Sequence, residues 1–406
     1  VAALPPCCRL ALVLSSQVHA GVRLRFPLPM VRSLKGVASG SLGSRGRKLL
    51  RRIIVGREGK LAQHSLRRKQ SRSIRSAAAA KESAEVGAHV GNYLPDACRG
   101  CVIVHGSHPS ILGSSVAKKG SVPFQWNPGD KTFTVANASR RRSCFTYVTF
   151  SGVEVFNKHG DAFPVGVTRS DEGVVEMVTS FVVVVKPRTA LKLCHVDANK
   201  PGSDIFAFPL EHLGVVPLAP SLSLPCPNEA GPEFGVPVFC FPLPVSQEPY
   251  LCTQGVGGHL THFFPQSYHA IDLRCQLRTP VLCIGNGVVK EVAQKHCCGG
   301  IHVSNLSKWN AVSIELDCGF VVEYVHTMPG STRVKEGDKV EVGQVICETG
   351  DIGFAPEPHL HIELHSSADP QGPSVPLCFG GHSSAFVPMA GRWYSPSGET
   401  PEASTS

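Results

Sequence analysis

The stretch that decides the fold spans residues 310–364 and reads NAVSIELDCGFVVEYVHTMPGSTRVKEGDKVEVGQVICETGDIGFAPEPHLHIEL. Short runs rich in valine and isoleucine alternate here with glycines, and such runs bounded by turn residues indicate strands. The stretch closes with His359-Leu360-His361 near its end. Since side chains alternate between the two faces of a strand, both imidazoles are expected on one face. The pattern predicts a series of short strands, the last of which presents a pair of histidines.

Two more side chains of the kind that bind metals precede this stretch. His262 follows the run Gln254-Gly255-Val256-Gly257-Gly258, and Asp272 lies inside Ala270-Ile271-Asp272-Leu273. Together with His361 they offer two imidazoles and one carboxylate. A catalytic zinc ion is typically held by three such protein ligands and keeps one position open for water. These residues therefore predict a catalytic zinc site.

The composition favours strands and turns over long helices. The chain has 406 residues, enough for two modest domains plus tails. It contains 40 glycines and 32 prolines, and only 17% of its residues are charged. We therefore predict an all-β protein.

The positive charge is concentrated at the beginning of the chain. Residues 1–75 hold 17 of the 40 basic residues and one acid, Glu58, so the remainder carries a net charge of −7 although the whole chain carries +9. The folded part is thus mildly acidic, which argues against nucleic-acid binding. Residues 1–95 resemble an Arg- and Ser-rich transit peptide for a plastid or mitochondrion, and a disordered basic leader explains them equally well. Without organelle targeting we expect a secreted protein, and no run is long enough for a transmembrane helix.

Turn and proline signals divide the rest of the chain. Residues 120–213 carry alternating runs separated by turns, which predicts a small β-sandwich-like accessory domain. Residues 214–237 are rich in proline and predict a semi-rigid linker. Residues 238–380 hold the short strands of the metal-binding core, and residues 381–406 form a C-terminal tail. Within the core, Gly285-Asn286-Gly287 is a hairpin signal.

The ordered set of motifs resembles the lysostaphin-type zinc endopeptidases, a family that cleaves peptidoglycan and includes bacterial autolysins. The first half of the likeness is QGVGGHLTHFFPQSYHAIDLRCQLRTPVLCIGNGVVKEV, residues 254–292, and the second half is the stretch quoted at the outset. Thr-Pro-Val, Gly-Val-Val, Tyr-x-His and His-Leu-His follow one another in the family's order. The likeness covers about residues 238–380 and implies an antiparallel β-sheet metallopeptidase core.

The resemblance also implies roles for single residues. His262, Asp272 and His361 would bind one zinc ion per chain, and His359 and His326 would form the catalytic pair. A zinc-bound water has its pKa lowered toward 7 and becomes a nucleophile. His359 would act as general base, while His326 would stabilise the oxyanion or share the proton.

The first ligand is where this chain departs from most members of the family. They carry it four residues before the aspartate, where this chain has Tyr268. Two candidates remain, His262 and His269. His269 lies three residues before Asp272, and positions i and i+3 of a strand face opposite ways. Members with an inserted loop carry a Gly-Gly-x-x-x-His element like the one that ends at His262, so we favour His262 and keep His269 as the alternative.

Two functions are compatible with this pattern. The first is a zinc metalloendopeptidase that hydrolyses stem or cross-bridge peptides of peptidoglycan, the partner that the resemblance implies. The second is a non-catalytic cell-wall-binding or activator module on the same fold. A complete set of ligands favours the enzyme. The sequence makes no prediction about the oligomeric state.

Overall fold

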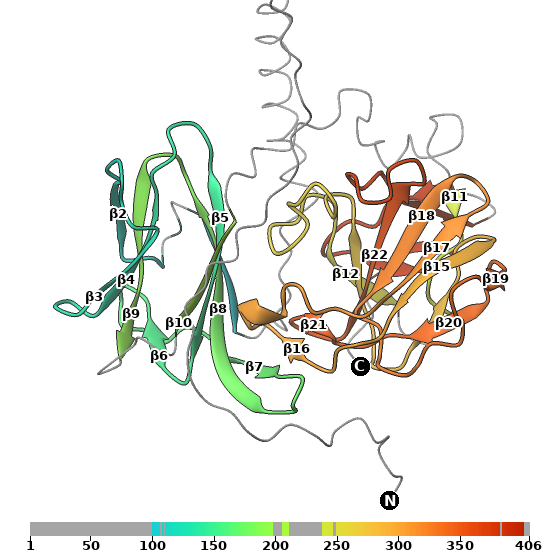
Figure 1. The fold of residues 1–406 in the computed structure, drawn as a ribbon, viewed down its shortest axis with the longest axis horizontal. Helices are drawn as coiled ribbons and strands as arrows, with labels where there is room; N and C mark the ends of the chain where they lie inside the picture. The colour runs from blue at the N-terminus through green and yellow to red at the C-terminus, as the bar shows by residue number, and fades with distance from the viewer. Residues whose placement is uncertain are drawn as a thin grey trace, which may run out of the picture. The chain divides into compact units, whose positions relative to one another are not determined.

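The structure is a computed structural model that describes residues 100–105, 108, 110–197, 205–210, 238–246, 249–381 and 384–401. Regular structure in these residues is β-strand, apart from one 3₁₀ turn, η2 (Val303–Asn305) (Figure 1). The all-β prediction is therefore confirmed. The predicted leader (1–95) and linker (214–237) lie outside the described residues. The described part of the chain contains no helix of the length and hydropathy that would cross a membrane.

The upstream strands form two sheets with a shared core. Their bounds are β1 (Cys101–His105), β2 (Gly113–Val116), β3 (Phe124–Asn127), β4 (Thr132–Asn137), β5 (Cys144–Ser151), β6 (Glu154–Phe156), β7 (Gly166–Arg169), β8 (Val175–Val185), β9 (Thr189–Asp197) and β10 (Ile205–Leu210). One sheet has the order β10-β5-β8-β7 with β1 beside β8, and the other has the order β2-β9-β4-β3 with β6 beside β9. Phe150 and Phe181 from the first sheet and Phe133 from the second pack in one buried cluster. These strands form a β-sandwich, as Figure 1 shows in green and teal.

The downstream strands build a larger antiparallel sheet. Their bounds are β11 (Val238–Phe239), β12 (Tyr250–Gln254), β13 (Ile271–Arg274), β14 (Pro280–Leu282), β15 (Gly287–Ala293), β16 (Gly299–Gly300), β17 (Ala311–Leu316), β18 (Phe320–Val325), β19 (Lys339–Val340), β20 (Val345–Glu348), β21 (Gly353–Phe354), β22 (His359–Ser366), β23 (Cys378–Gly381), β24 (Ser384–Phe386), β25 (Trp393–Ser395) and β26 (Gly398–Thr400). The main sheet has the order β19-β15-β17-β18-β22-β13-β12-β25-β26. Strands β25 and β26 come from the segment predicted as a tail, and they extend this sheet beside β12.

Strand β22 sits in the middle of this sheet and has one apolar and one polar face. Leu360, Ile362 and Leu364 are fully buried in the main hydrophobic core. Burying each such side chain stabilises the fold by about 1.5–3 kcal/mol. Because side chains alternate along the strand, the histidines at 359 and 361 lie together on the other face. The core thus fixes which face carries the polar residues.

The predicted hairpin at Gly285-Asn286-Gly287 is wrong. Strand β14 pairs with β20, whereas β15 pairs with β17 and β19, so the two strands beside these glycines belong to different sheets. A Cβ on Gly287 would lie 2.2 Å from the carbonyl oxygen of Glu315 on β17. Glycine is needed here for close approach to a neighbouring strand rather than for a two-residue turn.

The first upstream sheet continues into strands of the downstream half. Strand β16 pairs antiparallel with β7 and parallel with β21. All of these strands belong to one compact unit, Ser73–Ser406. Arg169 at the end of β7 donates to the carbonyl of Cys297 at 2.9 Å and to the carboxylate of Asp351 at 3.0 Å.

A small apolar cluster reinforces this junction. It joins Tyr147 on β5 to Leu260 and Phe263 of the loop between β12 and β13, and to Phe354 on β21. The rings of Phe145 and Phe263 stack with centroids 3.9 Å apart. The Tyr147 hydroxyl donates to the carbonyl of Leu260. The sandwich and the loops of the downstream half therefore share both hydrogen bonds and a core.

Candidate metal centre

Two neighbouring strands bring Asp272 and His361 together. Asp272 on β13 lies directly opposite His361 on β22 in an antiparallel pair. Residues opposite one another in such a pair have Cβ atoms about 4.5–5.5 Å apart on the same face. The Asp272 Oδ1 atom is 2.9 Å from Nδ1 of His361. The register of the sheet alone therefore places a carboxylate against an imidazole.

His262 reaches the same point from the loop between β12 and β13. Its Nε2 atom is 3.2 Å from Nδ1 of His361 and 3.2 Å from Oδ1 of Asp272. The three side chains are buried, with His262 fully so. Their ligand-type atoms all lie within 4.8 Å of one another. The structure thus brings the three predicted ligands together, and their binding of a metal stays a prediction.

The remaining ring nitrogen of each histidine is tied to an oxygen outside the cluster. Nδ1 of His262 lies 3.0 Å from the carbonyl oxygen of Gly255, and Nε2 of His361 lies 3.3 Å from Oε2 of Glu363. These oxygens accept hydrogen bonds, so we assign the ring protons to the nitrogens that face them. Nε2 of His262 is then left with its lone pair directed at Asp272 and His361. Such outer partners fix the tautomer and orientation of metal-binding histidines.

The electrostatics of the cluster favour a positive charge at its centre. Burial alone lowers the pKa of His361, but its hydrogen bond to the charged Asp272 and then that to Glu363 raise it to about 10. Burial raises the pKa of Asp272, yet the imidazoles of His262 and His359 hold it well below its usual value. A proton on His361 meets this demand in the metal-free protein, and a bound cation would displace it. Two imidazoles and a carboxylate are donors that suit Zn²⁺, so the residues fit the predicted metal.

The predicted catalytic pair lies beside this cluster. The rings of His326 and His359 have centroids 4.6 Å apart, and Nε2 of His359 is 3.7 Å from Oδ1 of Asp272. Nδ1 of His359 faces the carbonyl of Glu357 at 2.8 Å, and Nδ1 of His326 faces the carbonyl of Ile352 at 2.5 Å. By the same argument both rings keep a lone pair on Nε2.

His326 also has an unusual backbone. It directly follows β18 and has a φ of +64°, in the left-handed region that residues other than glycine rarely adopt. Burial, and then the neighbouring His359 and His361, hold its pKa well below the usual value, so the ring is neutral. Strained backbone of this kind persists where the surrounding structure requires it, often at functional sites.

The alternative first ligand, His269, lies in a different environment. Its Nδ1 atom is 2.7 Å from the carbonyl oxygen of Ser374, and its backbone N–H donates to the Ser374 hydroxyl. Burial lowers its pKa to about 4. It is not among the three side chains that converge, so the geometry favours His262 over His269.

One residue at this centre has no predicted role. Gln254, the last residue of β12, donates through Nε2 to Oδ2 of Asp272 at 2.8 Å. The sequence carries a weak signal for it, because Gln254 stands between a strand and the glycine-rich run that leads to His262.

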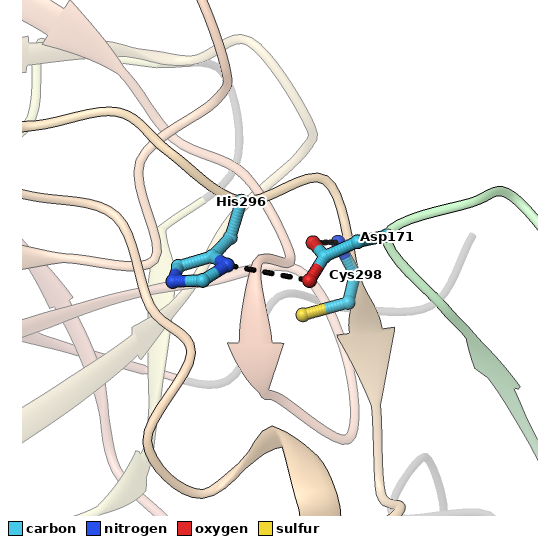
Figure 2. A group of neighbouring side chains, drawn as sticks. All are labelled: Asp171, His296 and Cys298. Atoms are coloured by element: carbon cyan, nitrogen blue, oxygen red, sulfur yellow. Dashed lines mark hydrogen bonds and ion pairs between the residues drawn. The ribbon is translucent and has the colours of Figure 1, made fainter. Parts of the chain in front are cut away.

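A second group of ligand-type side chains joins the sandwich to the main sheet. Figure 2 shows Asp171 between His296 and Cys298. Its carboxylate accepts from the backbone N–H groups of Cys297 and Cys298 at 2.8 and 3.0 Å, and Nδ1 of His296 is 3.3 Å away. Burial and the nearby Asp171 raise the pKa of Cys298 to about 11, so the thiol is a poor ligand. We interpret this group as structural, because the Asp171 carboxylate tethers the segment of residues 296–298 to the sandwich.

A third group extends the polar face of β22 beyond His361. Glu363 lies opposite Glu323 on β18, and His365 follows two residues later. Nε2 of His365 is 3.4 Å from Oε1 of Glu363, while its Nδ1 faces the carbonyl of Gly372 at 3.1 Å. The interactions of His365 and His361 with Glu363 account for both oxygens of this carboxylate, so it serves to hold the imidazoles in place.

Comparison with family models gives one match. Residues 266–373 match the model described as Peptidase family M23. The matched span begins just after His262 and contains Asp272, His326, His359 and His361.

Among curated proteins, a Buchnera aphidicola protein described as an uncharacterized metalloprotease is 29% identical over 97 residues. The match covers 24% of this chain and 23% of that relative, so the chain corresponds to about a quarter of the relative's length. Two solved structures are also similar. The catalytic domain of the prophage-encoded M23 protein EnpA from Enterococcus faecalis has 25% identity and a TM-score of 0.26, covering 33% of this chain and 93% of that chain. The catalytic domain of lysostaphin from Staphylococcus simulans has 22% identity and a TM-score of 0.22, covering 35% and 86%.

Proposed function

We propose, from the premise that residues 266–373 are a Peptidase family M23 domain, that this chain is a zinc-dependent endopeptidase. The family match supports a metallopeptidase in general. The observation that carries the more specific proposal is the convergence of His262, Asp272 and His361, with the outer nitrogen of each histidine already occupied. A merely structural cluster has no need for two imidazoles that turn ring nitrogens toward one carboxylate oxygen.

The metal would be held by Nε2 of His262, Oδ1 of Asp272 and Nδ1 of His361. When bound there, zinc supplies a Lewis acid and lowers the pKa of a coordinated water toward 7. The carbonyl of Gly255 and the carboxylate of Glu363 orient the two rings, and the sheet register positions Asp272. One zinc ion per chain is part of this proposal.

His359 is placed to take a proton at Nε2. Its Nδ1 proton is committed to the carbonyl of Glu357, so Nε2 is the free acceptor and it already lies beside Asp272. A general base must lie within hydrogen-bond reach of the proton that it removes, and Nε2 of His359 would take that proton from a water that the metal, if bound, would activate.

His326 acts next to His359 in this scheme. Its ring is neutral, and its Nδ1 proton is committed to the carbonyl of Ile352. Nε2 is therefore an acceptor in the resting protein. Of the two roles predicted for it, sharing the proton comes first, and His326 can donate to an oxyanion only after it has received that proton.

The proposed substrate is a peptide of the peptidoglycan type, cut at an amide bond in a stem or cross-bridge. This part of the proposal is supported by the ordered motifs of residues 254–364 and by the family of the matched domain. The convergence of His262, Asp272 and His361, with His326 and His359 beside them, supports the enzyme over the non-catalytic module.

Digestion of purified peptidoglycan sacculi by the full chain tests this function. We expect release of soluble fragments that stops with a chelator and returns with zinc. Asp272→Ala and His361→Ala should lose both the metal, measured by elemental analysis, and the digestion. His359→Ala should keep the metal and lose the digestion.

An exposed histidine of the sandwich provides the matched control. His159→Ala removes an imidazole far along the chain from the centre and should change neither quantity. Metal binding without any digestion of sacculi or of model peptides would establish the non-catalytic module instead. A wild-type chain that binds no zinc would refute the proposal altogether.

A further inference from the structure

Gln254 connects the two halves of the candidate metal centre through its side chain. It is 4% exposed and ends β12, immediately before the loop that carries His262. Both ends of its carboxamide are engaged. One end contacts the ligand that comes from a strand, and the other contacts the backbone of the ligand loop.

The amide nitrogen caps one oxygen of Asp272. Nε2 donates to Oδ2 of Asp272 at 2.8 Å and to the hydroxyl of Thr261 at 2.8 Å. The other carboxylate oxygen, Oδ1, is the one that faces His361 at 2.9 Å and His262 at 3.2 Å. Gln254 therefore supplies a hydrogen-bond donor to Oδ2, while Oδ1 faces the two imidazoles.

The amide oxygen holds the loop just before His262. Oε1 accepts from the backbone N–H groups of Leu260 at 3.0 Å and Thr261 at 2.9 Å, and that of His262 lies 3.4 Å away. Rotating the amide by 180° would set its NH₂ against these N–H groups, so the surroundings determine its orientation. The side chain that donates to Asp272 therefore also fixes the backbone of the loop just before His262.

The loop has the glycine that this arrangement needs. A Cβ on Gly258 would lie 2.3 Å from Cγ and 2.7 Å from Oε1 of Gln254. Its φ is not in the left-handed region, so the need for glycine at this position comes from the side chain of Gln254. The loop and the glutamine are therefore fitted to each other.

We propose that Gln254 is a positioning residue that makes Asp272 a one-oxygen ligand and sets its spacing from His262. The inference rests on the proposed zinc centre. Two imidazoles, one carboxylate oxygen and a water make the four-coordinate set typical of catalytic zinc. A carboxylate free to bind through both oxygens would use the position that the water needs.

Gln254→Met in the full chain tests this proposal, because methionine keeps the length of the side chain and removes the amide. Outer partners of metal ligands typically contribute 10–100-fold to metal affinity. We expect zinc affinity, measured by competition with a chromophoric chelator, to fall by about this factor. With Co²⁺ in place of zinc, the visible absorption of the wild type should be intense, as in four-coordinate sites, and that of Gln254→Met should be weaker as Asp272 becomes bidentate.

Two controls separate this role from a general loss of structure. Thr261→Val removes the other acceptor of the same Nε2 atom, and Gln344→Leu removes an exposed glutamine that accepts from the backbone N–H of Glu341. Both should keep the cobalt spectrum of the wild type. Near-UV circular dichroism of the metal-free proteins verifies that each variant is folded.

The outcomes distinguish this inference from the proposed function. A wild type that binds neither zinc nor cobalt refutes the metal centre itself. If the wild type binds and Gln254→Met matches its affinity and spectrum, only the positioning role is refuted. Weaker binding with an unchanged cobalt spectrum would also overturn it, because Gln254 would then stabilise the loop without acting on Asp272.

Discussion

Removing the hydroxyl of Tyr147 should loosen the loop that carries His262. This hydroxyl is buried and donates to the carbonyl of Leu260, two residues before His262. Tyr147→Phe keeps the ring contacts with Phe263 and Phe354 and leaves that carbonyl without its donor. An unsatisfied buried group costs about 1–3 kcal/mol, so we expect the free energy of unfolding to fall by this amount.

Part of this loss should appear at the metal centre. Gln254 also holds this loop, so the variant should still bind zinc. Each 1.4 kcal/mol by which the substitution destabilises the zinc-bound loop should weaken zinc binding about tenfold. The assay measures urea unfolding of the zinc-free chain and the rate at which a chelator removes zinc. We expect lower stability and faster release.

Tyr250→Phe is the matched control, because its hydroxyl donates to the carbonyl of Pro244 at 3.0 Å, which lies outside the loop that carries His262. Tyr250→Phe should lower the free energy of unfolding by a similar amount and leave the rate of zinc release unchanged. Equal zinc release from the Tyr147→Phe and wild-type chains would refute the argument that the sandwich supports the ligand loop.

Three further changes test other contacts. Glu363→Gln removes the charge that faces Nε2 of His361. Zinc affinity, measured by competition with a chelator, should therefore fall roughly tenfold. An unchanged affinity would exclude a role for this carboxylate in metal binding. Gly258→Ala places a Cβ against Gln254 and should lower both the melting temperature and zinc affinity, whereas a wild-type melting curve would show that the loop can shift freely. Although burial tends to raise the pKa of Asp171, its hydrogen bonds lower it to about 2, so this group stabilises the fold above pH 3.8 and that contribution disappears as the pH falls toward 2. Asp171→Asn should therefore reduce stability at pH 7 and flatten its decline between pH 4 and 2 in urea unfolding, and parallel pH curves for variant and wild type would contradict this.

The sequence was informative where chemistry follows from local periodicity. Alternation along residues 359–366 places the histidines on one face of β22 and the leucines and isoleucine on the other. The spacing from Asp272 argued against His269, and the structure places that side chain against Ser374.

Other features depend on contacts between distant segments, which a local pattern does not contain. Gly285-Asn286-Gly287 predicts a hairpin between the strands on either side of it, but β14 pairs with β20 instead. The role of Gln254 depends on the path of a loop across 18 residues to Asp272. The left-handed backbone of His326 is likewise set by its tertiary surroundings.

The pairing of β7 with β16 has a consequence for how such chains diversify. A recombination event that replaced residues 100–197 alone would remove the neighbour of Gly299–Gly300 and leave Phe263 and Phe354 exposed to water. The unpaired edge of β16 and the exposed rings of Phe263 and Phe354 would promote self-association. Exchange between ancestral genes is therefore expected to transmit both halves as one inherited block.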